Sequence, residues 1–275
     1  MQKELAVAAL VAALALGRAV PGAAAEPLAV TPKIRTAVAG LAAQTLEKAP
    51  AGTVLELAIA EHGRLVDEET LVAGAHASPK KAATPTLGTG TIETLLTATL
   101  VMQLVAAGTL NLEEPVSTVL PNLPYGARIT VGQLLSHRSG VADTIAEAIA
   151  SGETARPTNT GALIAAIGAE QLAQPPDTTW AYSNAGYALL AAIVAATLHR
   201  PFAAVVDQKV FAPAGMRASS VGAPPKGAVL AAPLGGESFP DASWLYGCGD
   251  LFSNASDVAR FDIALMDGTL LSLPQ

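Results

Sequence analysis

The sequence is short of charged residues and of cysteine. Charged residues make up 14% of its 275 positions, whereas apolar residues make up 51%. A chain with so little charge and so much apolar side chain can bury a sizeable core, which argues against a disordered protein. The single cysteine, Cys248, excludes an internal disulfide, and we expect it to be a small buried apolar side chain.

The N-terminal segment has the pattern of a secretory leader. Lys3 precedes an apolar run over 5–17, and three alanines at 23–25 form a cleavage site of small residues. Residues 1–25 are therefore predicted to be a signal peptide, with export to the periplasm or the cell exterior. An N-terminal anchor helix is the alternative, although the interruption at Arg18 leaves the run short for a membrane span.

Basic side chains are also scarce. Without the leader the chain has 14 basic and 22 acidic side chains, a net charge of −8. This balance argues against a nucleic-acid partner. No later segment has an uninterrupted apolar run of spanning length, so no stable membrane span is expected. The pattern gives no indication of oligomeric state.

The periodicity of apolar residues predicts a β-hairpin among helices. Strands are expected at 54–60 and, after His62-Gly63, at 64–68 with a continuation at 71–72, and a stretch over 219–243 is expected to be irregular. Helices are expected over 34–48, 91–107, 131–136 with Thr130 as N-cap, 161–172 and 187–198, after Pro201, and from Ser256 as N-cap to Met266. Two strands alone do not make a stable sheet, so either the irregular stretch contains strands or partner strands are missing.

Three segments carry a family resemblance. They are Leu-Val-Ala-Ala-Gly-Thr-Leu-Asn-Leu-Glu-Glu-Pro-Val at 104–116, followed by Ile-Thr-Val-Gly-Gln-Leu-Leu-Ser-His-Arg-Ser-Gly at 129–140; Trp-Ala-Tyr-Ser-Asn-Ala-Gly-Tyr at 180–187; and Gly-Cys-Gly-Asp-Leu-Phe-Ser at 247–253. In this order and spacing the chain resembles the serine β-lactamase and penicillin-binding-protein family, most closely its class C-like branch of D-alanyl-D-alanine carboxypeptidases and esterases. The resemblance runs from about residue 33 to the C-terminus.

The resemblance implies an α+β fold of β-lactamase/transpeptidase type over residues 26–275. An antiparallel sheet with flanking helices would pack beside an all-helical region, with a cleft between them. In the family, the tyrosine that matches Tyr182 moves protons, and the asparagine that matches Asn184 binds the substrate amide. The alternative is that Tyr182 is a buried aromatic residue whose hydroxyl is bonded to the backbone. A β-lactam, D-Ala-D-Ala peptide, ester or peptidoglycan-like ligand is implied, with no cofactor and no metal.

The nucleophile motif is where the sequence departs from the family. A serine and a lysine three residues later should open the long helix. Counting back from Leu100 places these positions at Thr91 and Thr94. A literal Ser-x-x-Lys at 78–81 is a decoy, because prolines at 79 and 85 leave no helix to align the pair.

Two threonines make a poor nucleophile–base pair. A threonine hydroxyl needs a base, and Thr94 cannot accept a proton near neutral pH. Glu93 is expected to point to another face of the helix, and Lys80 or Lys81 could in principle reach in from the loop. The simplest alternative is that Thr91 is only a helix N-cap and Thr94 an ordinary first-turn residue.

Two further groupings are weaker. His137, Ser139 and Asp143 lie close in sequence, but closeness in sequence does not make a catalytic triad, and the resemblance makes this stretch a structural turn. Asp257 and Arg260 are one helical turn apart and are expected to be a surface pair.

The third family motif, Lys-Thr-Gly or His-x-Gly on a late strand, is not found after Tyr182, and the chain is expected to be C-terminally truncated. That strand supplies an oxyanion-hole donor in the family. Three hypotheses therefore stand: a hydrolase-family protein with impaired catalysis, an active esterase or peptidase with a non-standard nucleophile, and a non-catalytic module that binds a cell-wall ligand or a partner.

Overall fold

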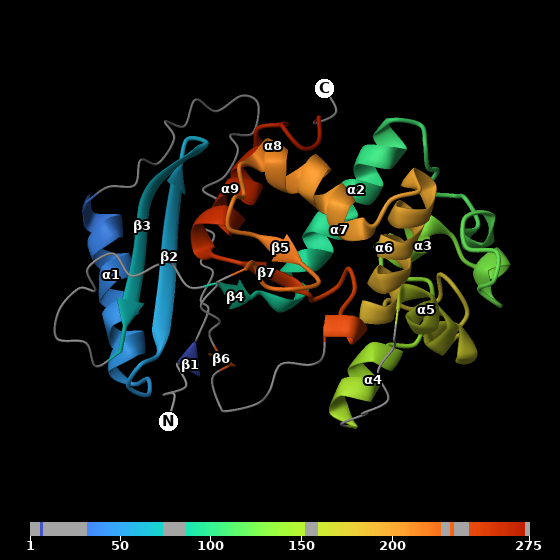
Figure 1. The fold of residues 1–275 in the computed structure, drawn as a ribbon, viewed down its shortest axis with the longest axis horizontal. Helices are drawn as coiled ribbons and strands as arrows, with labels where there is room; N and C mark the ends of the chain where they lie inside the picture. Colours follow the sequence, from blue (N-terminus) through green and yellow to red (C-terminus); the bar gives the residue numbers. More distant parts are fainter. Residues whose placement is uncertain are drawn as a thin grey trace.

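The computed structural model describes residues 6–7, 32–73, 86–151, 159–226, 232–233 and 242–272. A β-hairpin with helices lies at one end, a helical region at the other, and a small second sheet between them (Figure 1). This arrangement confirms the α+β class. Most of the expected leader at 1–25, the Ser-x-x-Lys at 78–81 and the Lys80–Lys81 pair lie outside the described residues.

The hairpin consists of β2 (Val54–Glu61) and β3 (Arg64–Val72), paired antiparallel from Val54↔Val72 to Glu61↔Arg64. His62 and Gly63 both have positive φ angles, 50° and 72°. Two central residues with positive φ are typical of the tight turn that matches the twist of antiparallel strands. The hairpin is therefore confirmed, and β3 runs without the break that the sequence left between residues 68 and 71.

The remaining strands are short. Next to β2 lie β1 (Ala6–Val7), which pairs parallel with β2, and β6 (Ala232–Pro233), which pairs parallel with β1. A second, antiparallel sheet has the order β4 (Leu87–Gly88), β7 (Leu251–Ser253), β5 (Ser220–Val221). The stretch 219–243 was expected to be irregular but contributes β5 and β6, because strands of two residues carry no readable alternation.

Helices make up most of the described chain. Their bounds are α1 (Pro32–Glu47), α2 (Glu93–Ala106), α3 (Val131–Leu135), α4 (Thr144–Ala150), α5 (Thr160–Ala169), α6 (Asn184–Leu198), α7 (Phe202–Val206), α8 (Ala212–Ala214) and α9 (Ala255–Met266). Short 3-10 turns are η1 (Gly90–Ile92), η2 (Val116–Thr118), η3 (Gly126–Arg128) and η5 (Ala242–Trp244), and η4 (Asp207–Phe211) is a π-helical turn. Helix α4 was not predicted from the sequence.

Helix α6 lies at the centre of the main core. Its residues from Ala185 to Val194 are all buried, and α2, α3, α4, α5 and α7 pack around it. In the part of the chain that the structure describes, no single helix is long and apolar enough to cross a membrane, although α6 together with 202–214, bent by 76°, reaches that length and apolarity.

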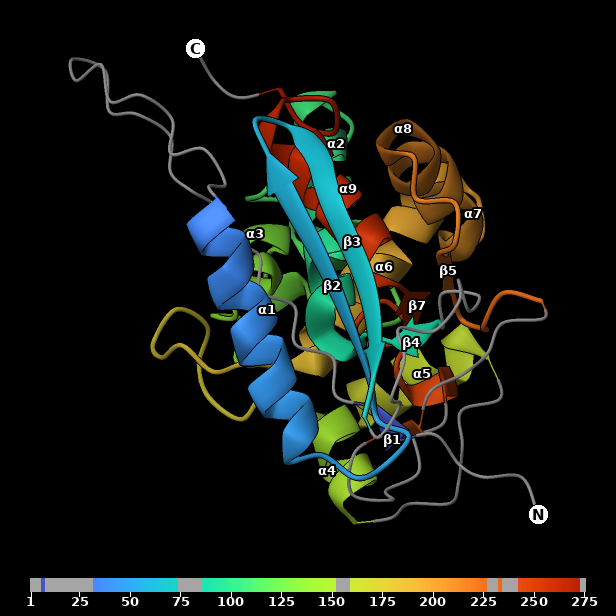
Figure 2. The ribbon, with the colours of Figure 1, turned by 90° about the vertical axis from the view of Figure 1, so that its left-hand side faces the viewer.

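The hairpin lies between α1 and α9 (Figure 2). Arg35 of α1 donates to Asp67 of β3 at 2.6 Å. On the opposite side, Glu56 of β2 accepts from the backbone N–H of Ala255 at 2.9 Å, and Glu68 of β3 accepts from the hydroxyl of Ser256 at 2.6 Å. Carboxylates at a helix N-terminus satisfy its free N–H groups, so the hairpin helps to define where α9 begins.

The helix caps confirm one prediction and correct another. Thr130 caps α3 by accepting from the N–H of Gln133 at 3.2 Å, and the side chain of Gln133 accepts from the N–H of Thr130 at 3.0 Å. The N-cap of α9 is Asn254, not Ser256, and it accepts from the N–H of Asp257 at 2.8 Å. The hydroxyl of Ser256 is bonded to the hairpin instead.

The Asp257–Arg260 pair is not a surface pair. The two side chains do contact, at 2.7 Å, but Asp257 is only 1% exposed. Its carboxylate also accepts from the N–H of Ala218 at 2.7 Å and the hydroxyl of Ser219 at 2.9 Å. Helical spacing correctly predicted the contact between Asp257 and Arg260. It carries no information on residues 218–219, which cover the Asp257 carboxylate.

Gly247 packs against α6 and has no room for a side chain. Its φ is +71°, and a Cβ there would lie 2.1 Å from the Cβ of Ala191. Its carbonyl accepts from the hydroxyl of Thr97 of α2 at 2.7 Å, so this glycine lies where α2 and α6 meet the segment before β7.

We predict that Gly247→Ala destabilises the protein by about 2–5 kcal/mol, because it combines a left-handed backbone with a steric clash in the core. Urea unfolding followed by circular dichroism measures the change. Gly40→Ala is the matched control: Gly40 lies in α1 with open space around it, so this variant is expected to gain about 0.5–1 kcal/mol. Equal stability of the two variants would contradict the prediction.

Candidate functional site

Tyr182 and Asn184 lie at the start of α6. Ser183 between them is the N-cap and accepts from the N–H of Gly186 at 3.0 Å. The hydroxyl of Tyr182 donates to Oδ1 of Asn184 at 3.3 Å, and Nδ2 of Asn184 donates to Asp143 at 2.8 Å. Tyr182 is 40% exposed, so the alternative of a buried tyrosine bonded to backbone is wrong.

Thr91 lies in η1, directly before α2, and its hydroxyl is near enough to the phenol of Tyr182 to lower the pKa of that phenol. The structure thus brings Thr91 close to Tyr182 and Asn184, which follow it by some ninety positions in the sequence. Thr91 is not the N-cap of α2, because the preceding turn η1 continues directly into the helix through Ile92.

Thr94 makes only a local contact. Its hydroxyl donates to the backbone carbonyl of Thr91 at 2.7 Å. A hydroxyl committed in this way supplies neither a positive charge nor a base to the Thr91 side chain. The expectation of an ordinary first-turn residue fits this geometry.

The phenol of Tyr182 is in an environment that keeps it protonated. Burial raises its pKa above the ordinary value of 10.0, and Cys248 and Asp143 raise it further, whereas the hydroxyl of Thr91 lowers it. A phenol that acts as a base near neutral pH needs a nearby positive charge. No lysine or arginine of the described segments is among the groups that shift the pKa of Tyr182.

His137 lies in an aromatic cluster beneath the site. Its ring centroid is 5.8 Å from Trp180, 4.6 Å from Tyr182 and 4.9 Å from Tyr187. Nδ1 accepts from the N–H of Ser183 at 3.2 Å, which places the proton of the neutral ring on Nε2. Burial lowers the pKa of His137, with Asp143 acting in the opposite direction.

These contacts do not form a triad. Ser139 is 3% exposed, and its hydroxyl accepts from the N–H of Val141 at 3.3 Å. Asp143 is bonded to Asn184 and to backbone N–H groups, and Nδ1 of His137 is occupied by Ser183. The three side chains therefore have other partners, as the resemblance implied.

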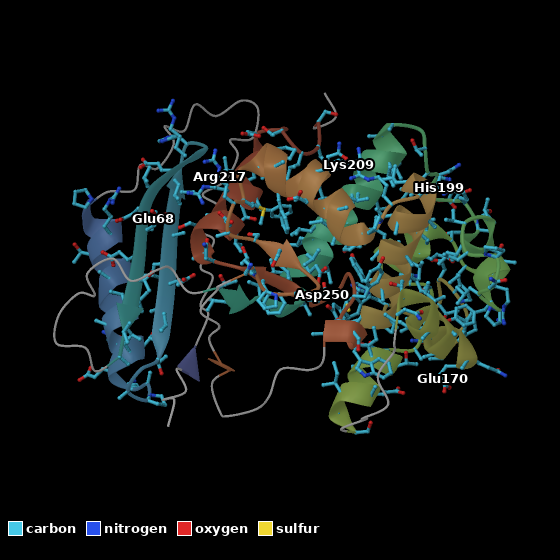
Figure 3. All side chains as sticks on the ribbon, in the orientation of Figure 1. Glu68, Glu170, His199, Lys209, Arg217 and Asp250 are labelled. Atoms are coloured by element: carbon cyan, nitrogen blue, oxygen red, sulfur yellow. The ribbon has the colours of Figure 1, made fainter. Side chains whose placement is uncertain are left out.

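A buried pair of carboxyl groups lies behind the site, and sequence reasoning missed it. Glu93 is fully buried, and its Oε2 accepts from the N–H of Asp250 at 2.6 Å (Asp250 is labelled in Figure 3). Oε1 of Glu93 and Oδ1 of Asp250 are buried without a hydrogen-bond partner. Burial, with the neighbouring carboxyl, raises the pKa of Glu93 well above 4.5, and burial also raises the pKa of Asp250. Two adjacent buried carboxyl groups favour holding a proton.

The same surroundings affect Cys248. It is 1% exposed, which confirms the expected small buried side chain, and its thiol donates to the carbonyl of Leu245 at 3.3 Å. Burial raises the pKa of this thiol, and Glu93 and Asp250 raise it further. Cys248 is thus held as a neutral thiol and is no nucleophile.

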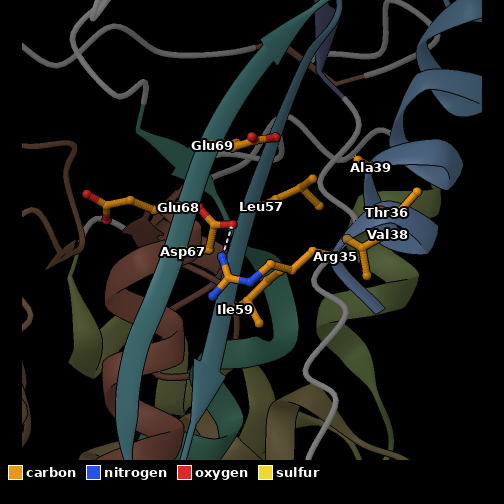
Figure 4. A pocket seen from close by; sticks show the side chains of 9 residues that line it. All are labelled: Arg35, Thr36, Val38, Ala39, Leu57, Ile59, Asp67, Glu68 and Glu69. Atoms are coloured by element: carbon orange, nitrogen blue, oxygen red, sulfur yellow. Dashed lines mark hydrogen bonds and ion pairs between the residues drawn. The ribbon is translucent and has the colours of Figure 1, made fainter. Parts of the chain in front are cut away.

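Two pockets among the described residues lie away from Tyr182. One, of about 250 Å³, lies between α1 and the hairpin, with Arg35 reaching Asp67 across it (Figure 4). The other, of about 640 Å³, lies between the loop at 119–124 and α5. Within the described ranges no group of three or more His, Cys, Asp or Glu residues could hold a metal ion. At the candidate site, the side chains of Tyr182 and of the 60%-exposed Trp180 are accessible to solvent.

Comparison with known proteins identifies the family. The Beta-lactamase family model matches residues 95–275, about two thirds of the chain, and the chain belongs to this family. The match begins directly after Thr94, so the assignment of Thr91 and Thr94 to the nucleophile motif rests on their position in the sequence and on the contact with Tyr182.

Relatives and solved structures agree with this membership. The chain is 33% identical over 195 residues to a Bacillus subtilis (strain 168) protein named as a penicillin-binding protein, PbpX, covering 66% of this chain and 47% of that one. A D-stereospecific amidohydrolase from Streptomyces sp. superposes with a TM-score of 0.64 at 25% identity, covering 83% and 72%. FmtA from Staphylococcus aureus has a TM-score of 0.70 at 18% identity, covering 88% and 68%, and shows the same fold. The chain spans less than half the length of the curated relatives it matches.

We predict that Glu93→Gln stabilises the protein above neutral pH. Because the pKa of Glu93 is raised in the folded state, folded molecules bind more protons than unfolded ones above pH 4.5, and stability falls as the pH rises. Glutamine keeps an acceptor for the N–H of Asp250 and adds a donor for its carboxylate. The gain is expected to be about 1–3 kcal/mol at pH 8 and close to zero at pH 4.5. Urea unfolding across this range measures it, and a gain that does not change with pH would contradict it.

Proposed function

We propose that the protein is an exported member of the β-lactamase family with impaired catalysis, which binds a β-lactam, a D-Ala-D-Ala peptide or an ester at the surface around Tyr182. One observation carries the proposal. The hydroxyl of Thr91 reaches the phenol of Tyr182, but the side chain one turn further on, Thr94, is bonded to backbone and carries no charge. Loss of a nucleophile–base pair lowers kcat by roughly 10³–10⁶.

Binding requires fewer groups than turnover. Trp180 and Tyr182 present exposed aromatic surface, and Asn184 is held by Asp143 next to the phenol. Aromatic surface beside an ordered amide is suited to an acyl or peptide ligand. The relatives named as penicillin-binding proteins and the D-stereospecific amidohydrolase support ligands of these classes. Export rests on the leader pattern at 1–25.

A second candidate, an active hydrolase with Thr91 as its nucleophile, is favoured by the same proximity of Thr91 to Tyr182. It requires Tyr182 to take the proton of Thr91. The raised pKa of Tyr182 works against that step, because the phenol is protonated at neutral pH and becomes a base only after it has lost that proton. The third candidate is a non-catalytic module that binds a cell-wall ligand or a partner. It differs from the first candidate in that restoring the serine and the lysine would not restore a reaction.

We predict that Thr91→Ser with Thr94→Lys gains covalent labelling by a fluorescent penicillin. The lysine would add a positive charge one helical turn after the hydroxyl and lower the pKa of Tyr182. Intact-mass spectrometry and gel fluorescence measure the adduct, and a gain of at least about tenfold over the unmodified protein is expected.

Thr91→Ala with Thr94→Lys is the matched control, because it carries the same charge without the nucleophile and should stay unlabelled. An adduct on Thr91 of the unmodified protein would overturn the impaired-catalysis proposal. Equal labelling of the serine and alanine variants would show that residue 91 is not the nucleophile position.

A further inference from the structure

Asp143 lies between two helix N-termini and is bonded to both. It caps α4 by accepting from the N–H of Ala146 at 3.3 Å. The same carboxylate accepts from the N–H of Ala185 in the first turn of α6 at 3.3 Å, and its other oxygen accepts from Nδ2 of Asn184 at 2.8 Å. One side chain thus joins the loop at 137–143 to the helix that carries the candidate site.

We propose that Asp143 is a positioning residue that fixes the amide orientation of Asn184 and, through it, the direction in which the phenol of Tyr182 donates its proton. This inference rests on the proposed function, since it describes how the Tyr182 surface is prepared for an acyl ligand or for proton transfer.

The chemistry of the carboxylate decides the orientation. An ionised carboxylate only accepts hydrogen bonds, so the face of Asn184 turned toward Asp143 must be its NH₂ group. Oδ1 must then face the phenol, 3.3 Å from the hydroxyl oxygen of Tyr182, and it can only accept. The single proton of Tyr182 is therefore directed at Asn184, which leaves the phenol oxygen as an acceptor for the hydroxyl of Thr91.

The result is a directed chain of hydrogen bonds from Tyr182 to Asn184 to Asp143, with the hydroxyl of Thr91 near its start. Each donor points toward the negative charge at its end. Without that charge the amide can turn over, since an asparagine presents a donor on one side and an acceptor on the other. Nδ2 would then face the phenol oxygen, and the Tyr182 proton would be free to turn toward Thr91.

Several titratable groups face this chain. His137 stacks on Tyr182, Cys248 lies close enough to raise the pKa of the phenol, and Tyr187 packs against His137. All three are neutral near pH 7 by the contacts described above. Asp143 is the carboxyl group that is joined to Tyr182 through a hydrogen-bonded side chain, that of Asn184.

A spectrophotometric titration of Tyr182 tests the inference. The absorbance change of phenolate formation is recorded for the full chain and for its Tyr182→Phe form, and the difference gives the pKa of Tyr182. Asp143→Asn is expected to lower that pKa by about one unit, a tenfold gain in phenolate at a given pH, because the charge is removed and the turned amide now donates to the phenolate.

A double-mutant cycle separates positioning from charge. In an Asn184→Leu background there is no amide to turn, so Asp143→Asn should lower the pKa by clearly less than in the native background. An equal shift in both backgrounds would overturn the proposal and leave Asp143 as a simple charge. Glu147→Gln removes a charge from the exposed first turn of α4 without touching Asn184, and it should leave the pKa of Tyr182 unchanged.

Asparagine and serine are both good helix caps, so Asp143→Asn should fold, and Asp143→Ser replaces it if circular dichroism shows a loss of structure. The serine variant also removes the charge and must show the same dependence on Asn184. The titration uses no substrate, so its outcome is independent of the penicillin-labelling test. If the penicillin label is not gained but the pKa shift caused by Asp143→Asn depends on Asn184, the proposed function alone is rejected. If the label is gained but the pKa shift is the same in both backgrounds, only the role of Asp143 is rejected.

Discussion

The attachment of the first turn of α2 to the segment 247–251 places the candidate site. Thr89 bonds the carbonyl of Leu251, Glu93 accepts from the N–H of Asp250, and Thr97 donates to the carbonyl of Gly247. These contacts run from the residues before α2 into its second turn. Strand β4, which precedes them in the sequence, pairs with β7. Thr91 is thereby held at the surface beside Tyr182, so the position of the predicted nucleophile depends on interactions of residues that are not themselves part of the site.

The Glu93–Asp250 contact makes this attachment sensitive to charge. Both carboxyl groups are buried, and each has one oxygen without a partner. Two buried carboxyl groups with unsatisfied oxygens lower the stability of the folded state unless one of the groups is protonated. The side chain that closes the junction is thus an acidic one, directly before the position at which the family places its lysine, and no lysine or arginine of the described residues is among the groups that shift the pKa of Tyr182.

Sequence reasoning predicted the elements with strong local patterns. The hairpin, the Thr130 cap and the long apolar helices were recoverable because alternation, turn residues and capping boxes are properties of neighbouring positions. We also expected Thr91, Tyr182 and Asn184 to lie together. This expectation came from the family resemblance of the motifs and not from local residue patterns. The Glu93–Asp250 pair joins residues 157 positions apart, and the burial of Asp257 depends on a loop 39 positions away. Neither contact leaves a local pattern, which explains why one was missed and the other was assigned to the surface.

If catalysis is impaired as proposed, the ordered site persists without its base. The hydrogen bonds around Tyr182 are nearly complete without a ligand: Asp143 satisfies two helix N-termini, His137 accepts from Ser183, and Asn184 links Asp143 to the phenol. These contacts stabilise the start of α6, the most buried helix of the core, so the arrangement contributes to folding whether or not a reaction takes place. Since each of them satisfies a backbone or amide group that would otherwise need a partner, the proposed loss of the nucleophile pair would remove chemistry without removing the forces that shape the site. An ordered Tyr182–Asn184 surface is therefore compatible with binding alone.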